Sequence, residues 1–275
     1  MPAVVIIRSH GATIAVRGPR AELDAIVAET EPSGGERVDG DDGAPVDAIV
    51  SLRLPSSVEP GEVRRGDDIV AESHDPDEVR RIALSETHLA IAAHARDGVF
   101  VHAGAVSWRG AGIVLPGRSM AGKSTLVREL VGRGATYFSD EYAVIGSDGG
   151  LRPYLKPIAR REGGGHIAGV SLDEIERTAT AVVPVVVVAR LTYGPSPQWP
   201  PSLVEGAPAV LPLVDNAVAA RLAPDRVLDA VTSLVGTATV WSGERPDAAI
   251  AAEWLIEVVE RGAASGPDHA PPPAA

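Results

Sequence analysis

Four residues near the middle of the chain have the types and spacing of a phosphate-binding loop. Gly117, Gly122, Lys123 and Ser124 match the pattern G-x-x-x-x-G-K-[ST]. The N–H groups of such a loop point inward and the next helix has partial positive charge at its N-terminus, so a polyphosphate binds there. The lysine then reaches the β- and γ-phosphates, and the serine hydroxyl binds Mg²⁺. The predicted nucleotide-binding residues are Gly117, Arg118, Ser119, Met120, Ala121, Gly122, Lys123, Ser124 and Thr125.

The flanking sequence predicts the elements that must hold this loop. Residues 113–115 form a short apolar strand before it, and apolar residues between 126 and 131 recur with helical spacing after it. Gly132 and Gly134 then stop the helix. Residues 99–108 have the pattern of a further strand, so the loop is expected to follow a hairpin.

A competing interpretation of the same residues is a hydrolase nucleophile. Gly117, Ser119 and Ala121 fit a relaxed form of the G-x-S-x-G turn. Such an enzyme needs an acid and a histidine later in the chain, and only His166 and His269 follow. The second of these lies in a Pro- and Ala-rich tail. The order of strand, glycine loop and helix therefore favours phosphate binding.

The acid that would complete a magnesium site is not at the end of the most apolar strand. That strand, at 185–189, is followed by Arg190. Asp140 and Glu141 come soon after the P-loop helix instead, which places two carboxylates one strand away from the phosphates. One could bind the metal, directly or through water, and the other could accept a proton from an attacking hydroxyl. A helix cap or a solvated turn is the alternative interpretation of this pair.

With these residues the chain resembles HPr kinase/phosphorylase and its smaller relatives, whose fold is akin to that of phosphoenolpyruvate carboxykinase. The resemblance covers roughly residues 99–161 and consists of a strand with His102, the hairpin into the P-loop, and the acidic pair. It implies an α/β fold in which a P-loop domain has a mixed sheet. It also implies that Asp140 is the catalytic base, that Glu141 is its partner and metal neighbour, and that His102 titrates beside them. The family pair is usually Asp-Asp, and the downstream signature of the phosphorylase reaction is missing here.

The activity that the resemblance implies is an ATP- and Mg²⁺-dependent kinase acting on a hydroxyl. A serine of a peptide or protein is the expected acceptor, because smaller relatives accompany ribosomal peptide biosynthesis. Ser124, Asp140 and Glu141 would be the metal ligands. An arginine could stabilise the transferring group, and Arg160 is preferred to Arg161 and Arg190 because its segment follows the acidic strand. A nucleotide-binding regulatory ATPase without kinase activity and a kinase for a small molecule are the alternatives.

The composition limits the partners and the cellular compartment that can be expected for this chain. The 275 residues have a net charge of −12, which argues against general binding of nucleic acid. Cysteine is absent, and no apolar stretch approaches the ~20 residues that span a membrane. We therefore expect a cytoplasmic protein with no membrane association, and an oligomer is compatible with the sequence. Lysine occurs at positions 123 and 156 alone, and every other basic side chain is arginine or histidine.

The pattern along the chain predicts two domains and a tail. Residues 1–97 are expected to form a small α/β unit, with substrate recognition as one role, residues 98–264 the P-loop kinase-like domain, and residues 265–275 a disordered tail. The expected elements of the small unit are strands at 3–7 and 12–17 joined by a Ser-His-Gly turn, a helix at 20–29, a loop at 31–47, strands at 47–54 and 68–72, and a helix from 75 to about 96. Those of the later part are strands at 182–191 and 237–241, and helices at 224–235 and 246–262.

Overall fold

The computed structural model describes residues 3–38, 45–117, 121–161, 167–195 and 198–265, and gives the backbone alone at 159–161, 167–170, 264 and 265. The chain is a mixed α/β protein that divides into two compact units. The first comprises Met1–Phe100 and Val218–Pro224, and the second comprises Val101–Ala217 and Asp225–Ala275. Residues 266–275 of the predicted tail lie outside the described residues. In the part of the chain that is described, no helix is long and apolar enough to cross a membrane.

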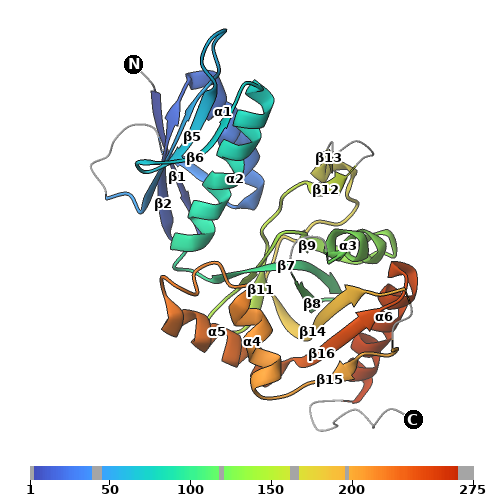
Figure 1. Ribbon diagram of the computed structural model, residues 1–275. Coiled ribbons are helices and arrows are strands. Elements are labelled where there is room, and N and C mark those ends of the chain that lie inside the picture. The colour runs from blue at the N-terminus through green and yellow to red at the C-terminus, as the bar shows by residue number, and fades with distance from the viewer. Residues whose placement is uncertain (1–2, 39–44, 118–120, 162–166, 196–197, 266–275) are drawn as a thin grey trace. The chain divides into compact units, whose positions relative to one another are not determined.

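The first unit is a sheet with two helices packed on one face (Figure 1). The strands follow the order β3-β1-β2-β4-β5-β6, and β2 and β4 are the parallel pair. Helix α2 starts as the sequence predicts, because the Asp75 carboxylate accepts a hydrogen bond of 2.9 Å from the N–H of Asp77. The elements are β1 (Ala3–Ser9), β2 (Ala12–Gly18), α1 (Arg20–Thr30), η1 (Glu31–Ser33), β3 (Glu36–Val38), β4 (Ala48–Arg53), β5 (Gly61–Arg65), β6 (Asp68–Ser73) and α2 (Pro76–His94).

Two strands of this unit are not evident in the sequence. Strand β3 lies inside the segment expected to be a loop, so that prediction is wrong for residues 36–38 and for the short helix η1. Strand β5 was not expected at all. Both are short, and β3 is an edge strand whose partner β1 lies far away in sequence. The hydrogen bonds of β3 come from pairing with a distant strand. Strand β5 pairs with its neighbours β4 and β6, but its five residues are mostly charged and too few to show a periodic apolar pattern.

The second unit is built on a mixed sheet in which β8, the strand before Gly117, is central. Its path is β11-β10-β7-β8-β14-β16-β15, and β9 pairs separately with β7. Strands β8, β14 and β16 are parallel, whereas β7 and β8 form an antiparallel hairpin. The strands are β7 (Val99–Trp108), β8 (Ala111–Pro116), β9 (Thr136–Ser139), β10 (Tyr142–Ile145), β11 (Gly150–Arg152), β12 (Ile158–Arg161), β13 (Ile167–Val170), β14 (Val183–Tyr193), β15 (Ser202–Leu203) and β16 (Thr239–Arg245).

The predicted hairpin of strands before Gly117 is confirmed. Strands β7 and β8 pair from Ala103 and Pro116 to Trp108 and Ala111. The turn between them uses Arg109 and Gly110, with φ of 51° and 84°. Two successive residues with positive φ make the tight turn that matches the twist of a hairpin. The P-loop is thus attached to an antiparallel pair.

Helices lie on both sides of this sheet (Figure 1). The predicted helices of the C-terminal region are confirmed as α5 and α6, whereas α4 was not predicted. Helix α4 contains Pro212 in its interior, and proline there normally disfavours a helix. The helices are α3 (Lys123–Gly132), η2 (Leu172–Glu174), α4 (Ala207–Asp215), α5 (Pro224–Thr237) and α6 (Ala248–Ser265).

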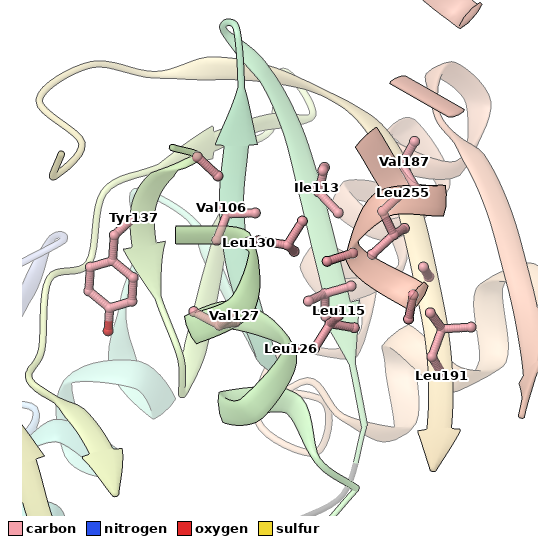
Figure 2. Packing of buried hydrophobic residues seen from close by; sticks show 14 of the residues in the cluster. Val106, Ile113, Leu115, Leu126, Val127, Leu130, Tyr137, Val187, Leu191 and Leu255 are labelled. Carbon is pink, nitrogen blue, oxygen red and sulfur yellow. The ribbon is translucent and has the colours of Figure 1, made fainter. Parts of the chain in front are cut away.

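The core of the second unit fixes the position of the P-loop helix. Leu126, Val127 and Leu130 of α3 are fully or almost fully buried against apolar residues of β7, β8 and β14 (Figure 2). Leu255 of α6 closes the same cluster, and Leu191 extends it along β14. Removing apolar area from water contributes about 25 cal/mol per Å², so this cluster strongly favours one placement of α3. The start of α3 is fixed with it.

Gly104 brings β7 unusually close to the P-loop helix. A Cβ atom at this position would lie 2.5 Å from Cγ2 of the buried Val127 side chain. We expect Gly104→Ala to destabilise the protein by about 1–3 kcal/mol, because a β-branched side chain in a packed core cannot easily move aside. Urea unfolding measures this change. The double variant Gly104→Ala/Val127→Ala should lose less free energy of unfolding than the sum of the losses of the two single variants.

A matched control for this variant lies in α5. A Cβ at Gly236 would meet nothing within 4 Å, so Gly236→Ala should keep or slightly raise the free energy of unfolding. If Gly104→Ala is as stable as Gly236→Ala, then β7 and α3 are not in the close contact described here.

Candidate functional site

The described ends of the P-loop are tied together by the predicted lysine. Strand β8 ends at Pro116, Gly117 follows, and α3 begins at Lys123. The Lys123 Nζ donates a hydrogen bond of 2.7 Å to the carbonyl oxygen of Gly117. Gly122 has a φ of 82°, a left-handed conformation that favours glycine. Arg118, Ser119 and Met120 lie outside the described residues.

The first turn of α3 holds the remaining residues of the motif. Ala121 and Ser124 are partly buried, and Thr125 is exposed. A serine in the first turn lies where the helix N-terminus has unpaired N–H groups and partial positive charge. The position suits a hydroxyl that binds a metal carried by phosphate oxygens.

The acidic pair lies in a turn whose shape is set by Ser139. Its Oγ accepts hydrogen bonds from the N–H groups of Glu141 and Tyr142, at 3.3 and 3.1 Å. The turn joins β9 to β10, and Asp140 is 6% exposed. The alternative interpretation as a solvated turn therefore does not fit Asp140. The backbone that carries the two carboxylates is instead held in a defined conformation by these hydrogen bonds.

Adjacent residues of β7 connect the acidic turn to the P-loop. The N–H of Ala103 donates to the carbonyl oxygen of Glu141 at 3.1 Å. The carbonyl oxygen of His102 accepts a hydrogen bond of 3.3 Å from the N–H of Gly117. One dipeptide of one strand therefore holds both the carboxylates and the beginning of the phosphate loop.

Charges in this region act on Lys123. Burial lowers the pKa of its ammonium group, and the negative charges of Asp140 and Glu141 oppose that shift. Those two carboxylates are thus close enough to stabilise the protonated lysine. An ammonium beside acids is poised to bind a phosphate that arrives with its own metal cation.

Tyr137 supports the buried Asp140. Its hydroxyl donates a hydrogen bond of 2.7 Å to the carbonyl oxygen of Lys156, and it lies 3.5 Å from Oδ1 of Asp140. Burial, followed by the charge of Asp140, raises the pKa of the Tyr137 phenol. The phenol stays protonated and fixes the loop after β11 beside the acid. The ring belongs to the core in Figure 2, where its hydroxyl points away from the apolar cluster.

Lys156 is a site residue that the sequence analysis did not predict. Its ammonium forms an ion pair with Glu141 and lies 5.7 Å from the centroid of the Tyr142 ring. The Lys156 side chain is 14% exposed. The available signal was its rarity, because lysine occurs at only two positions in the chain. The structure brings both of them to the same acidic pair.

His102 lies beside the same turn. Its ring packs on that of Tyr142 with centroids 4.7 Å apart. Burial lowers the pKa of His102 from its ordinary 6.5; the charge of Glu141 opposes this, and Lys123 adds to it. We therefore expect a neutral imidazole at pH 7, which is compatible with a hydrogen-bonding role next to the acids.

The lowered pKa of His102 predicts a pH dependence of stability. The unfolded chain binds the proton near pH 6.5, while the folded protein resists it until lower pH. The contribution of neutral His102 to the stability of the fold is present above about pH 6.5. It is lost as the pH falls through and below that value. Between about pH 7.5 and about pH 5.5, the free energy of unfolding in urea should fall less for His102→Gln than for the wild type. An equal loss in both proteins would contradict the burial of this imidazole.

Of the predicted arginines, the structure describes the side chain of Arg190 alone. Arg160 and Arg161 belong to β12, which pairs with β13, and their side chains lie outside the described part. Arg190 is exposed on β14, and its neighbour Leu191 packs in the core on the opposite face. Arg190 lines a hollow of about 300 Å³ with Thr192, Ser242, Gly243 and Glu244.

The acid set offers oxygen ligands that suit a metal carried by a nucleotide. Among the described residues, no three His, Cys, Asp or Glu side chains converge as a metal site. Mg²⁺ is commonly held by one or two carboxylates together with substrate phosphates and water. Ser124, Asp140 and Glu141 provide ligand oxygens of that kind.

Comparison with known proteins gives little further guidance. No family model matches the chain. No curated protein matches it either. The solved Hpr(Ser) kinase/phosphatase from Coxiella burnetii aligns with a TM-score of 0.35 and 16% identity, over 59% of this chain and 96% of that one. A likeness of that size carries no conclusion about this protein, so its function has to be inferred from the site itself.

Proposed function

We propose that the second unit is a kinase that transfers the γ-phosphoryl group of Mg-ATP to a hydroxyl, with a serine of a peptide or protein as the acceptor. The observation that carries this proposal is the pair of hydrogen bonds from β7. Through them, residues 102 and 103 hold Gly117 of the P-loop and Glu141 of the acidic turn. A phosphate-binding lysine and two carboxylates are thereby attached to the same strand.

Each charged group has a distinct part in the proposed transfer. Lys123 binds the β- and γ-phosphate oxygens, and Asp140 receives the proton of the acceptor hydroxyl. The hydroxyl oxygen bonds to the γ-phosphorus as the bond to the bridging oxygen breaks, and ADP leaves with that oxygen. Mg²⁺, held by Ser124 and Glu141, would neutralise charge on the phosphates.

The ion pair with Lys156 separates the roles of the two acids. Glu141 already has a cation, and its side chain is 38% exposed, whereas Asp140 is buried. A buried carboxylate beside a fixed phenol is better oriented to accept a proton. We therefore assign the base to Asp140 and a metal-facing, charge-balancing role to Glu141.

The test uses the full chain, Mg-ATP and peptides encoded beside its gene. Intact mass spectrometry should show a peptide heavier by one phosphate group, and the gain should disappear with EDTA. ADP without any modified acceptor would favour the regulatory ATPase, and phosphorylation of small hydroxyl compounds alone would favour the small-molecule kinase. Failure of the wild-type chain to bind Mg-ATP at all would rule out the whole proposal.

A further inference from the structure

We infer that Arg245 is a phosphate-binding residue of the nucleotide site, where its guanidinium group contacts an oxygen of the polyphosphate of a nucleoside triphosphate. This inference deepens the proposed function and rests on it. It concerns a residue at the C-terminal end of β16, far from the P-loop in sequence. The sequence patterns that reveal the P-loop do not indicate it.

The first support is a buried cation that forms no ion pair with a carboxylate among the described residues, although the charge of Asp247 acts on it. Arg245 is 3% exposed. Its Nη1 donates to the carbonyl oxygen of Pro246 at 2.9 Å and its Nη2 to that of Gly122 at 3.2 Å. Its Nε is buried and has no hydrogen-bond partner among the described residues. Within that part of the chain, Arg245 forms no ion pair with a carboxylate.

Such an arrangement is costly unless something else compensates it. A charge taken out of water loses several kcal/mol of hydration, and two neutral carbonyl groups restore only part of this. Two carbonyl contacts alone do not require a guanidinium. An anion that binds beside Gly122 would supply the missing charge and could accept the free donor.

The second support is the position of Arg245 in the sheet. Strands β8, β14 and β16 are parallel, so their C-terminal ends lie along the same edge. Strand β8 leads into Gly117 at this edge, and β16 ends there with Arg245. Ligands of open parallel sheets bind outside the C-terminal ends of the strands. Arg245 is therefore on the edge where the phosphates are expected.

The third support is the close approach of Arg245 to the P-loop glycine. A Cβ atom at Gly122 would lie 2.5 Å from Nη2 of Arg245. The guanidinium group thus lies in the space that a Cβ atom of residue 122 would take, directly at the N-terminus of α3. Tyr193, opposite Arg245 in the β14–β16 register, holds its ring centroid 5.7 Å from the Arg245 Cζ. This cation–π contact helps to orient the guanidinium group.

The test compares Arg245→Met with the matched variant Arg177→Met. Arg177 also donates to a backbone carbonyl, that of Gly134 beyond the other end of α3, but its side chain is 60% exposed. Calorimetric titration of the full chain with Mg-ATP and with inorganic tripolyphosphate should show both affinities lowered about tenfold or more by Arg245→Met. Arg177→Met should stay within about twofold of the wild type.

Further measurements separate phosphate binding from structural support. Affinity for phosphates falls as the salt concentration rises. If Arg245 contacts phosphate, the plot of log affinity against log salt concentration should be less steep by about one in Arg245→Met than in the wild type. A weaker affinity with an unchanged slope would overturn the inference, as would weakened Mg-ATP binding with unchanged tripolyphosphate binding. Should Arg245→Met fail to fold by circular dichroism, Arg245→Lys replaces it. Lysine keeps the charge but not the planar fork, and an affinity equal to that of the wild type would contradict the role.

The outcomes also distinguish this inference from the proposed function. If the wild-type chain binds neither Mg-ATP nor tripolyphosphate, the proposed function fails and the role of Arg245 fails with it. If the wild type binds both and Arg245→Met binds them equally well, the inference alone is wrong. The kinase proposal would then stand without this residue.

Discussion

Asp140→Asn should abolish nearly all phosphoryl transfer while leaving the affinity for Mg-ATP within a few-fold of the wild type. An amide has the shape of the carboxylate but cannot accept the proton of the acceptor hydroxyl. General base catalysis is worth about 10²–10⁴-fold, so we expect turnover to fall by about a thousandfold. Nucleotide binding depends mainly on the P-loop, which this change leaves intact. Turnover is measured as labelled phosphate on the peptide, and affinity by calorimetric titration.

The control for this variant is another acid in the same unit. Asp148 lies in the turn between β10 and β11, and its side chain is 61% exposed in an ion pair with Arg152. Asp148→Asn should retain turnover, because exposed ion pairs contribute little and the site is elsewhere. If Asp140→Asn transfers phosphate as fast as Asp148→Asn, Asp140 is not the base.

A nucleotide-binding protein without transfer would behave differently. There the buried Asp140 would serve only to balance the charge of Lys123, and the amide would change ATP hydrolysis little. The two variants therefore distinguish a kinase from a regulatory ATPase even before the natural acceptor is identified.

The parts of the site that the sequence revealed are those built from neighbouring residues. Strand β8, Gly122 and α3 follow one another directly, so strand, glycine turn and helix each leave a local pattern. The turn at Arg109 and Gly110 is local too. The acidic pair could be placed because one short strand separates it from α3.

The parts that the sequence did not reveal depend on tertiary contacts. Lys156 meets Glu141 only because the loop after β11 folds back beside Tyr137. Arg245 reaches Gly122 only through the parallel alignment of β8, β14 and β16. No spacing in the chain encodes either contact. The same reason explains the missed strand β3, whose partner β1 lies far away in the sequence.

Lys123→Met should weaken the binding of Mg-ATP by about a hundredfold and lower turnover further. The ammonium group is expected to make charge-assisted hydrogen bonds to two phosphate oxygens, each worth about 1.5–3 kcal/mol. Methionine has a similar length and suits the partly buried position, so a large change in folding is not expected. The affinity is measured by calorimetric titration, and thermal unfolding of the nucleotide-free protein verifies the fold.

Two other basic residues make the test specific. Arg133, just after α3, pairs with Glu129 at the surface, and Arg133→Met should bind Mg-ATP like the wild type. Lys156→Met should have an intermediate effect, because it frees Glu141 without touching the P-loop. Lys123 lies between Gly117 and the acids, so the removal of its charge should outweigh both. If Lys123→Met and Arg133→Met bind Mg-ATP with equal affinity, residues 117–125 are not a nucleotide site and the kinase proposal loses its basis.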